Sequence, residues 1–282
     1  MLNNNALNTI LACMATSKEA YEIQKVQTAH RIKLVESWGM EEGSKILEIG
    51  CGQGDTTAVL AYYTGETGLV HGVDIGPPTY GAPITLGEST DYLKQSKLGK
   101  QIKINFNMDI LSPDVDFPED AFDYVVFSHC SWYMKSTSEL LHMMKKVRKW
   151  AKQLCFAEWS TTIHSLEQYP HLLAILIQAQ YEAFKQNSES NVRTILTPPE
   201  IRTVVEDAGW KVLEETTIHS QDLQDGQWEV DMVKHDINFE LSRTENMPGK
   251  FKELIRSEVL MLEQYIKNGV IKPLSVYSFT AN

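Results

Sequence analysis

The sequence predicts a doubly wound α/β fold. Short apolar, β-rich runs alternate with helical patterns from about residue 40 to residue 220, as in the βαβ units that build a parallel sheet. Some runs are apolar at every position, as in Tyr124-Val125-Val126-Phe127, which is typical of a strand covered by helices on both faces. The expected strands are 45–50, 68–75, 102–107, 122–128, 153–158 and 210–218.

Helical periodicity fills the gaps between these strands. Thr16 and Glu19 have capping-box spacing ahead of an apolar stripe that stops at Gly39, and Ser136 with Glu139 has the same spacing. Pro198-Pro199 opens a further helix that runs to Gly209. Two long amphipathic helices are expected outside the minimal alternation, at about 170–184 and 251–266.

Composition and charge exclude several classes of function. The 282 residues carry a net charge of −11, which disfavours extended nucleic acids and anionic membranes as partners. The four cysteines, at positions 13, 51, 130 and 155, form no CxxC pair and have no zinc-ligand spacing with histidine. We therefore expect free thiols and no metal site. The longest apolar run, Leu172–Ile177, is too short to span a bilayer, and no basic residue precedes the mildly apolar Leu7–Ala15, so a cytoplasmic protein is expected.

The strongest chemical signal is the segment from Lys45 to Gly54. An apolar strand runs into Gly50, Gly52 and Gly54, and a helical pattern follows. Glycines permit a tight turn and let the backbone approach a ligand closely, and the helix N-terminus adds unpaired N–H groups.

Two ligand types compete for this loop. A dinucleotide fingerprint places its third glycine five positions after the first, where this chain has Asp55. Glu48 precedes the glycines and would repel a phosphate, whereas it suits a cationic ligand.

At this point the sequence resembles the class I S-adenosylmethionine-dependent methyltransferases. Glu48-x-Gly-x-Gly-x-Gly54 is similar to their first motif. The resemblance implies that the loop, with Gly50, Cys51, Gly52 and Gly54, surrounds the methionyl part of S-adenosyl-L-methionine. It also implies that the carboxyl group of Glu48 helps to orient the ammonium group.

Three later strand ends extend the resemblance. Asp74 ends the second strand and would accept the ribose hydroxyls, with Ile75 packing on adenine. Asp109 would accept a hydrogen bond from the adenine amino group, and the next residue, Ile110, is a further expected cofactor-binding residue. Ser128 and His129 end the fourth strand, facing the sulfonium and the acceptor; polyamine synthases resemble this fold but have an acid here.

The resemblance also implies a mostly parallel, seven-stranded sheet whose last strand, about 273–280, inserts antiparallel. We expect an N-terminal helical cap at 1–39 and a methyltransferase domain at 40–282, with helical insertions at about 161–197 and 221–270 that cap the acceptor site. The expected function is methyl transfer from S-adenosylmethionine to a small-molecule acceptor, releasing S-adenosyl-L-homocysteine.

Other functions remain open at this point. The same loop would serve a regulatory protein that binds S-adenosylmethionine without transfer, or a protein or tRNA methyltransferase, while a nicotinamide oxidoreductase fits the glycine spacing less well. His129 is the candidate general base, although displacement at an activated methyl group can proceed through positioning and desolvation alone. Glu158 and Trp159 could border the acceptor or pack in the core, and the same alternatives hold for Ser131-Trp132-Tyr133.

Overall fold

The computed structural model describes residues 4–188, 190–267 and 269–282 and contains one seven-stranded sheet. The strand order is β3-β2-β1-β4-β5-β7-β6, and β7 is antiparallel to both of its neighbours while β1 to β5 pair in parallel. The expected sheet, including its antiparallel last strand, is therefore confirmed. The bounds are β1 Lys45–Ile49, β2 Leu69–Val73, β3 Ile102–Asn105, β4 Phe122–Ser128, β5 Ala151–Trp159, β6 Val212–Ile218 and β7 Val276–Ala281.

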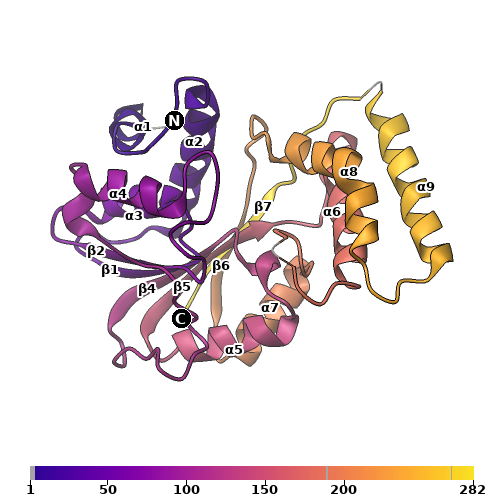
Figure 1. The fold of residues 1–282 in the computed structure, drawn as a ribbon. Helices are drawn as coiled ribbons and strands as arrows, with labels where there is room; N and C mark the ends of the chain where they lie inside the picture. The colour runs from indigo at the N-terminus through magenta and orange to yellow at the C-terminus, as the bar shows by residue number, and fades with distance from the viewer. Residues whose placement is uncertain (1–3, 189, 268) are drawn as a thin grey trace.

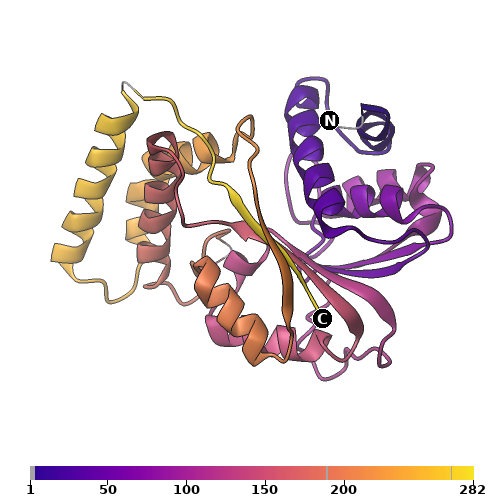
Figure 2. The same ribbon diagram turned by 180° about the vertical axis from the view of Figure 1, so that it is seen from behind.

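Helices cover both faces of the sheet (Figures 1 and 2). One face packs against α1 Asn4–Leu11, α2 Tyr21–Trp38, α3 Asp55–Thr64 and α4 Leu86–Gln95. The other packs against α5 Thr137–Val147 and α7 Pro198–Asp207. Because side chains alternate along a strand, Ile46 contributes to the first core and Leu47 to the second. Short 3-10 helices connect these elements at η1 Gly99–Gln101, η2 Ser131–Tyr133 and η3 Leu166–Gln168.

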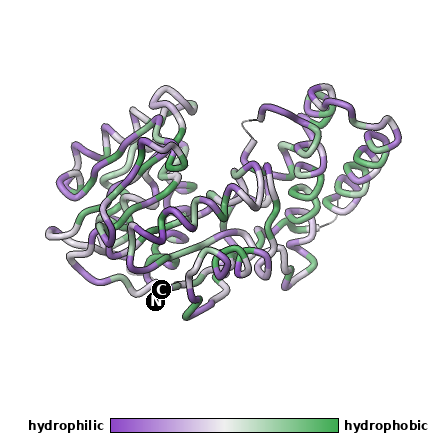
Figure 3. The backbone as a smooth tube through the Cα atoms, turned by 90° about the horizontal axis from the view of Figure 1, so that it is seen from below, coloured by the Kyte–Doolittle hydropathy of each residue, from purple (hydrophilic) through white to green (hydrophobic). Residues whose placement is uncertain are grey.

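A separate three-helix unit consists of α6 Tyr169–Glu182, α8 Asp225–Ser242 and α9 Gly249–Ile266. These helices share their own core, and hydrophobic stretches run through this unit as well as through the sheet (Figure 3). α6 and α9 match the two long helices that the sequence predicts, but α9 lies on the outer side of the unit, away from α2 (Figures 1 and 2). Its apolar stripe packs on the other two helices, and the covering of an acceptor by this unit stays a prediction.

α8 was not expected from the sequence. Its buried residues, Val230, Val233, Ile237 and Leu241, follow helical spacing, but charged residues between them dilute the pattern. None of the described helices is both long enough and apolar enough to cross a membrane.

The start of α2 corrects a second expectation. The helix begins at Tyr21 without a side-chain cap, and Ser17 Oγ instead accepts the Ala20 N–H at 3.2 Å. The predicted capping box of Thr16 and Glu19 is therefore absent from the described structure, because the chain turns once more before the helix. The predicted end is confirmed, since Gly39 takes a left-handed conformation with φ 61°.

α2 is anchored to β7, which lies between β5 and the edge strand β6. The buried Trp38 indole donates to Ser278 Oγ at 2.9 Å, which joins the N-terminal helices to β7. We expect Trp38→Phe to lower the free energy of unfolding by about 1–3 kcal/mol, because it leaves the buried Ser278 hydroxyl without its donor.

Chemical denaturation of Trp38→Phe, Ser278→Ala and the double variant measures this coupling. The double variant should cost less than the sum of the single ones, because removing both partners leaves no orphaned polar group. Additive losses would show that the hydrogen bond does not tie the two elements together.

Candidate active site

The glycine segment forms a tight loop between β1 and α3. The N–H groups of Gly50 and Cys51 both donate to the Val73 carbonyl, at 2.9 and 3.2 Å, which fixes the loop against the end of β2. Gly50 has φ 71°, and a Cβ atom there would lie 3.0 Å from the Cys130 Cβ atom, so a side chain is disfavoured. At Gly52, with φ 52°, a Cβ atom would meet nothing within 4 Å. The loop backbone is therefore exposed to an approaching ligand at Gly52.

Glu48 lies beneath this loop and is only 2% exposed. The Thr57 hydroxyl donates to its Oε2 atom at 2.5 Å. Burial raises the pKa of the Glu48 carboxyl group to about 8, even though the Thr57 hydrogen bond and the nearby Arg31 act in the opposite direction. A positively charged ligand group beside Glu48 would favour its ionised form.

At the end of β2, the side chain of Asp74 accepts a hydrogen bond from the glycine loop. Its Oδ2 atom accepts the Gly52 N–H at 2.8 Å, and its Oδ1 atom accepts the Gly76 N–H at 2.7 Å. A carboxylate has about four lone-pair positions, so acceptor capacity remains for hydroxyl groups of a ligand. The next side chain, Ile75, is 69% exposed and presents an apolar surface beside that carboxylate.

The end of β3 is held close to the end of β2. The Met108 N–H donates to the Asp74 carbonyl at 3.0 Å, and the Asn107 N–H donates to the Gly76 carbonyl at 3.1 Å. Asp109 is exposed, and its Oδ1 atom accepts the Leu111 N–H at 2.8 Å. Ile110 is buried in the core, and so is the side chain of Cys51, so their side chains do not face the exposed loop surface.

The last residue of β4, Ser128, and the next residue, His129, have unusual surroundings. The Ser128 hydroxyl is buried and has no hydrogen-bond partner in the described structure. His129 takes a left-handed conformation with φ 52°, which is uncommon for a residue other than glycine and clusters at functional sites. Its Nδ1 atom lies 3.5 Å from Glu158 Oε1, and its Nε2 atom lies 3.1 Å from His30 Nε2.

Glu158 organises the turn after β4. Its Oε2 atom accepts hydrogen bonds from the Ser131 N–H at 3.0 Å, the Ser131 hydroxyl at 2.7 Å and the Trp132 N–H at 3.3 Å. Its Oε1 atom accepts the Trp159 N–H at 2.9 Å. Since the carboxylate is buried and these donors surround it, Glu158 fixes the backbone around His129.

The three residues of η2 divide between the core and the surface. Trp132 is 2% exposed, and its indole donates to the Leu196 carbonyl at 3.3 Å, so it seals the core. Tyr133 is 43% exposed. Of the two aromatics, only Tyr133 has the exposure that a wall of an acceptor site requires.

His30 on α2 is the residue that the sequence analysis missed. Its Nδ1 atom is hydrogen-bonded to Ser220 Oγ at 2.9 Å, and its ring is parallel to that of Trp159 with centroids 6.2 Å apart. Burial, followed by the proximity of His129, holds the pKa of His30 well below its usual range, so its ring is neutral. In the sequence, His30 lies in the apolar stripe of α2, and this position indicated only that it packs in the core. The one signal that could have identified it is that a histidine occupies a position otherwise filled by apolar residues.

Together these groups fit S-adenosylmethionine. The ligand offers ammonium, hydroxyl and amino donors, and the carboxyl groups of Glu48, Asp74 and Asp109 are matching acceptors grouped at three neighbouring strand ends. The open backbone at Gly52 and the orphaned Ser128 hydroxyl are further features that a ligand can use.

The comparisons with known proteins define the class. The sequence model of the methyltransferase domain family matches residues 23–215. The chain belongs to this family, and its fold is that of a methyltransferase domain.

Three known proteins are similar to this chain, each over a different share of its length. The methyltransferase phomM' of Diaporthe leptostromiformis is 28% identical over 242 residues, which cover 72% of this chain and 62% of that protein. A cyclopropane-fatty-acyl-phospholipid synthase-like protein from Lactobacillus casei is 31% identical over 99% of both chains, with a TM-score of 0.88. A Haemonchus contortus N-methyltransferase in complex with S-adenosylhomocysteine shares the fold at 16% identity, covering 89% of this chain and 52% of that one, with a TM-score of 0.50.

The raised pKa of Glu48 predicts how stability depends on pH. The folded protein holds a proton on Glu48 up to about pH 8, whereas an unfolded glutamate releases it near pH 4.3, so this carboxyl group destabilises the fold increasingly as the pH rises between these values. We expect Glu48→Gln to be more stable than the wild type at pH 8, with the difference shrinking towards pH 5.

Denaturation of both proteins at pH 5, 6, 7 and 8 without ligand tests this expectation. Glu66→Gln, which changes an exposed carboxylate, is the matched control and should show no such trend. A stability difference between wild type and Glu48→Gln that does not change with pH would contradict the assignment.

Proposed function

We propose that the chain transfers the methyl group of S-adenosylmethionine to a small-molecule acceptor. The observation that carries this proposal is the position of His129 directly after β4, the neighbour of β1 in the sheet, where its ring packs against Trp159 with centroids 4.7 Å apart. This edge of the sheet is flanked by α2 and the three-helix unit (Figure 1). α2 and α8 are joined there, since Gln27 Nε2 donates to Asp225 Oδ2 at 2.7 Å. This contact supports a small acceptor over a folded protein or a tRNA, and the net charge of −11 further disfavours tRNA.

In this proposal each strand end binds a different part of the cofactor. Glu48 and the backbone of Gly50 to Gly54 hold the methionyl part, and Asp74 accepts the ribose hydroxyls. Ile75 packs on the adenine ring, and Asp109 accepts its amino group. Ser128 lies at the end of β4, where it faces the sulfonium group and the acceptor.

The cofactor, when bound, supplies a methyl group on a positively charged sulfur. The chain's own contribution is to orient the acceptor beside Tyr133 and His129 and to exclude water, which accounts for much of the acceleration in such displacements. A hydroxyl or ammonium acceptor also loses a proton. His129 is the proposed proton acceptor. Its Nδ1 atom is buried and faces Glu158, so the proton would be taken up at Nε2, the atom that lies 3.1 Å from His30 Nε2 and for which the acceptor would compete with His30.

One observation favours another acceptor. The Lactobacillus casei protein, which is similar along its whole length, carries a name that refers to fatty acyl phospholipids, so a lipid acyl chain is the second candidate. The chain spans 62% of the curated phomM' methyltransferase that it matches, so that protein's function carries less weight.

A turnover assay distinguishes these candidates. Release of S-adenosylhomocysteine is measured with pools of small amines, alcohols and thiols, with unsaturated phospholipid vesicles, with tRNA and with a folded protein. We expect release with a small-molecule pool only. Faster release with vesicles, tRNA or protein would overturn the small-acceptor proposal, and saturable binding of the cofactor without turnover on any acceptor would favour a regulatory role.

The role of Asp74 predicts a loss of cofactor affinity. We expect Asp74→Ala to weaken S-adenosylmethionine binding by about 1.5–3 kcal/mol, which is about ten- to a hundredfold, because hydrogen bonds to charged groups lie in this range. Calorimetry measures the affinity, with the exposed Asp91→Ala as control. Asp74→Asn keeps the shape of the side chain and an oxygen that can accept the Gly52 N–H, and it should also bind the cofactor weakly. Unchanged affinity in both Asp74 variants would contradict the assignment of Asp74 to the ribose hydroxyls.

The role of His129 predicts a separation of turnover from binding. We expect His129→Ala to lower kcat by about a hundredfold while leaving cofactor affinity nearly unchanged, the usual scale of acid–base assistance. His30→Phe keeps a ring against Trp159 but removes the hydrogen bond to His129 Nε2, so it should shift the pH profile of kcat with a smaller loss. The exposed His142→Phe is the control. An undiminished rate in His129→Ala would leave positioning and desolvation as the whole mechanism.

A further inference from the structure

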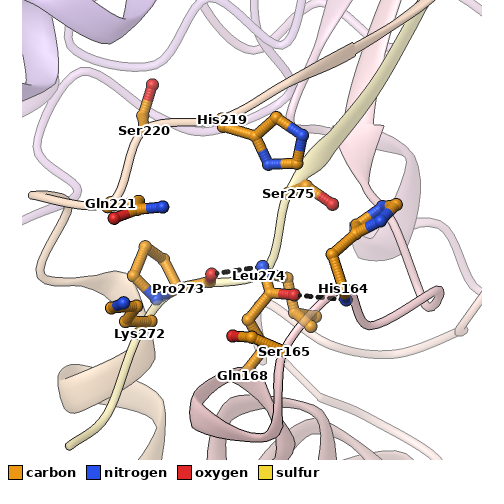
Figure 4. A pocket seen from close by; sticks show the side chains of 10 residues that line it. All are labelled: His164, Ser165, Gln168, His219, Ser220, Gln221, Lys272, Pro273, Leu274 and Ser275. Atoms are coloured by element: carbon orange, nitrogen blue, oxygen red, sulfur yellow. Dashed lines mark hydrogen bonds between the residues drawn. The ribbon is translucent and has the colours of Figure 1, made fainter.

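A second pocket lies at the other end of the same sheet edge. It has a volume of about 340 Å³, within the range of about 300–1,000 Å³ that is common for ligand sites. Three chain segments form it: the loop and η3 after β5, the loop after β6 and the approach to β7 (Figure 4). In the strand order, β4 lies between β1 with its glycine loop and the strands β5, β7 and β6 to which these segments belong, so the pocket is distinct from the proposed cofactor site.

The pocket is rich in groups that can donate hydrogen bonds. His164 and His219 meet edge to face with ring centroids 5.2 Å apart, and Ser220 and Gln221 line the pocket beside them (Figure 4). Within the described residues, no group of three or more His, Cys, Asp or Glu side chains could hold a metal ion. The two imidazoles, which pack on each other, line the pocket as hydrogen-bonding groups.

Ser275 is the observation that points to a ligand. It lines the pocket, it is 1% exposed, and its hydroxyl has no hydrogen-bond partner in the described structure. A buried hydroxyl without a partner is costly, so such groups call for an explanation. Figure 4 shows this hydroxyl on the side of the pocket where the His164 and His219 rings lie.

The charges around the pocket favour an anion. Lys272 lines it and pairs with Glu167 at 2.5 Å. Lys33 on α2 reaches the same corner, donating to the His219 carbonyl at 3.2 Å and to Ser220 Oγ at 3.4 Å. The structure gives Lys33 no ion pair with a described residue, so a positive charge remains at the rim in a protein of net charge −11.

The pocket wall is held in shape by hydrogen bonds that a ligand does not have to supply. The His164 N–H donates to Gln168 Oε1 at 2.7 Å, and Gln168 Nε2 donates to the Pro273 carbonyl at 2.9 Å (Figure 4). Such a preformed wall lowers the ordering cost of binding. Ser220, moreover, is the residue that hydrogen-bonds His30, so this pocket contacts the network that reaches His129.

We propose that this pocket binds a small oxyanion, a phosphate or carboxylate group, through Ser275, Lys272 and the two imidazoles. The proposal is independent of the methyl acceptor, because it rests on a different set of residues.

Calorimetric titration of the 282-residue chain with sodium phosphate and, separately, with sodium acetate tests the proposal at constant ionic strength. We expect one saturable site for at least one of the two anions. Tighter binding of phosphate would identify a phosphate-bearing ligand, and tighter binding of acetate a carboxylate. An absence of saturable binding for both anions would overturn the proposal.

Three variants locate the site. Ser275→Ala should weaken anion binding about tenfold while leaving the unliganded protein as stable as the wild type or more so, because the hydroxyl has no partner to lose. Lys272→Gln should also weaken binding, and Lys250→Gln, which removes an exposed lysine on α9, should not. Wild-type affinity in Ser275→Ala, or an equal loss in Lys250→Gln, would show that the anion binds elsewhere or only screens charge.

Discussion

The five parallel strands β1 to β5 all end at one edge of the sheet, and each candidate ligand group depends on this constraint. A parallel sheet aligns its carboxyl ends, so the residue that follows each strand meets the residues that follow its neighbours. Glu48, Asp74 and Asp109 are separated along the chain but lie at neighbouring ends in the order β3-β2-β1. Hydrogen bonds between the loops, such as that from the Gly52 N–H to the Asp74 side chain, then fix these ends relative to one another.

Two buried carboxyl groups at this edge are stabilised in different ways. Glu158 is surrounded by donors from Ser131, Trp132 and Trp159, which compensate for its loss of water. Glu48 receives one hydroxyl hydrogen bond from Thr57, and burial raises its pKa. The contrast fits their positions: Glu158 serves the protein's own backbone, whereas Glu48 has acceptor capacity left for a cationic ligand.

The N-terminal helices are part of the site as well as a cover for the sheet. α2 contributes His30 to the surroundings of His129, Gln27 to the contact with α8 and Trp38 to the anchor on β7. It also carries Lys33 to the rim of the second pocket. One helix thus contacts both ends of the sheet edge, and its position affects the chemistry proposed at each.

The sequence by itself determined the α/β class, the strand ends and the glycine loop, because these depend on local signals: continuous apolar runs, glycines next to them and acids just after them. It also located α6, α7 and α9 through their periodicity and proline signals. It misplaced the start of α2, because an alternative turn at Ser17 competes with the capping box, and it missed α8, whose apolar stripe is diluted by charge.

Only the tertiary structure decided what surrounds His129 and where the second pocket lies. His30 and Ser220 are 190 residues apart in the chain yet share a hydrogen bond, and the pocket joins three segments that are distant in sequence. Contacts of this kind arise when packed helices and strand ends meet in space. They leave no periodicity or spacing in the sequence, because each partner is selected by a neighbour that the local chain does not contain.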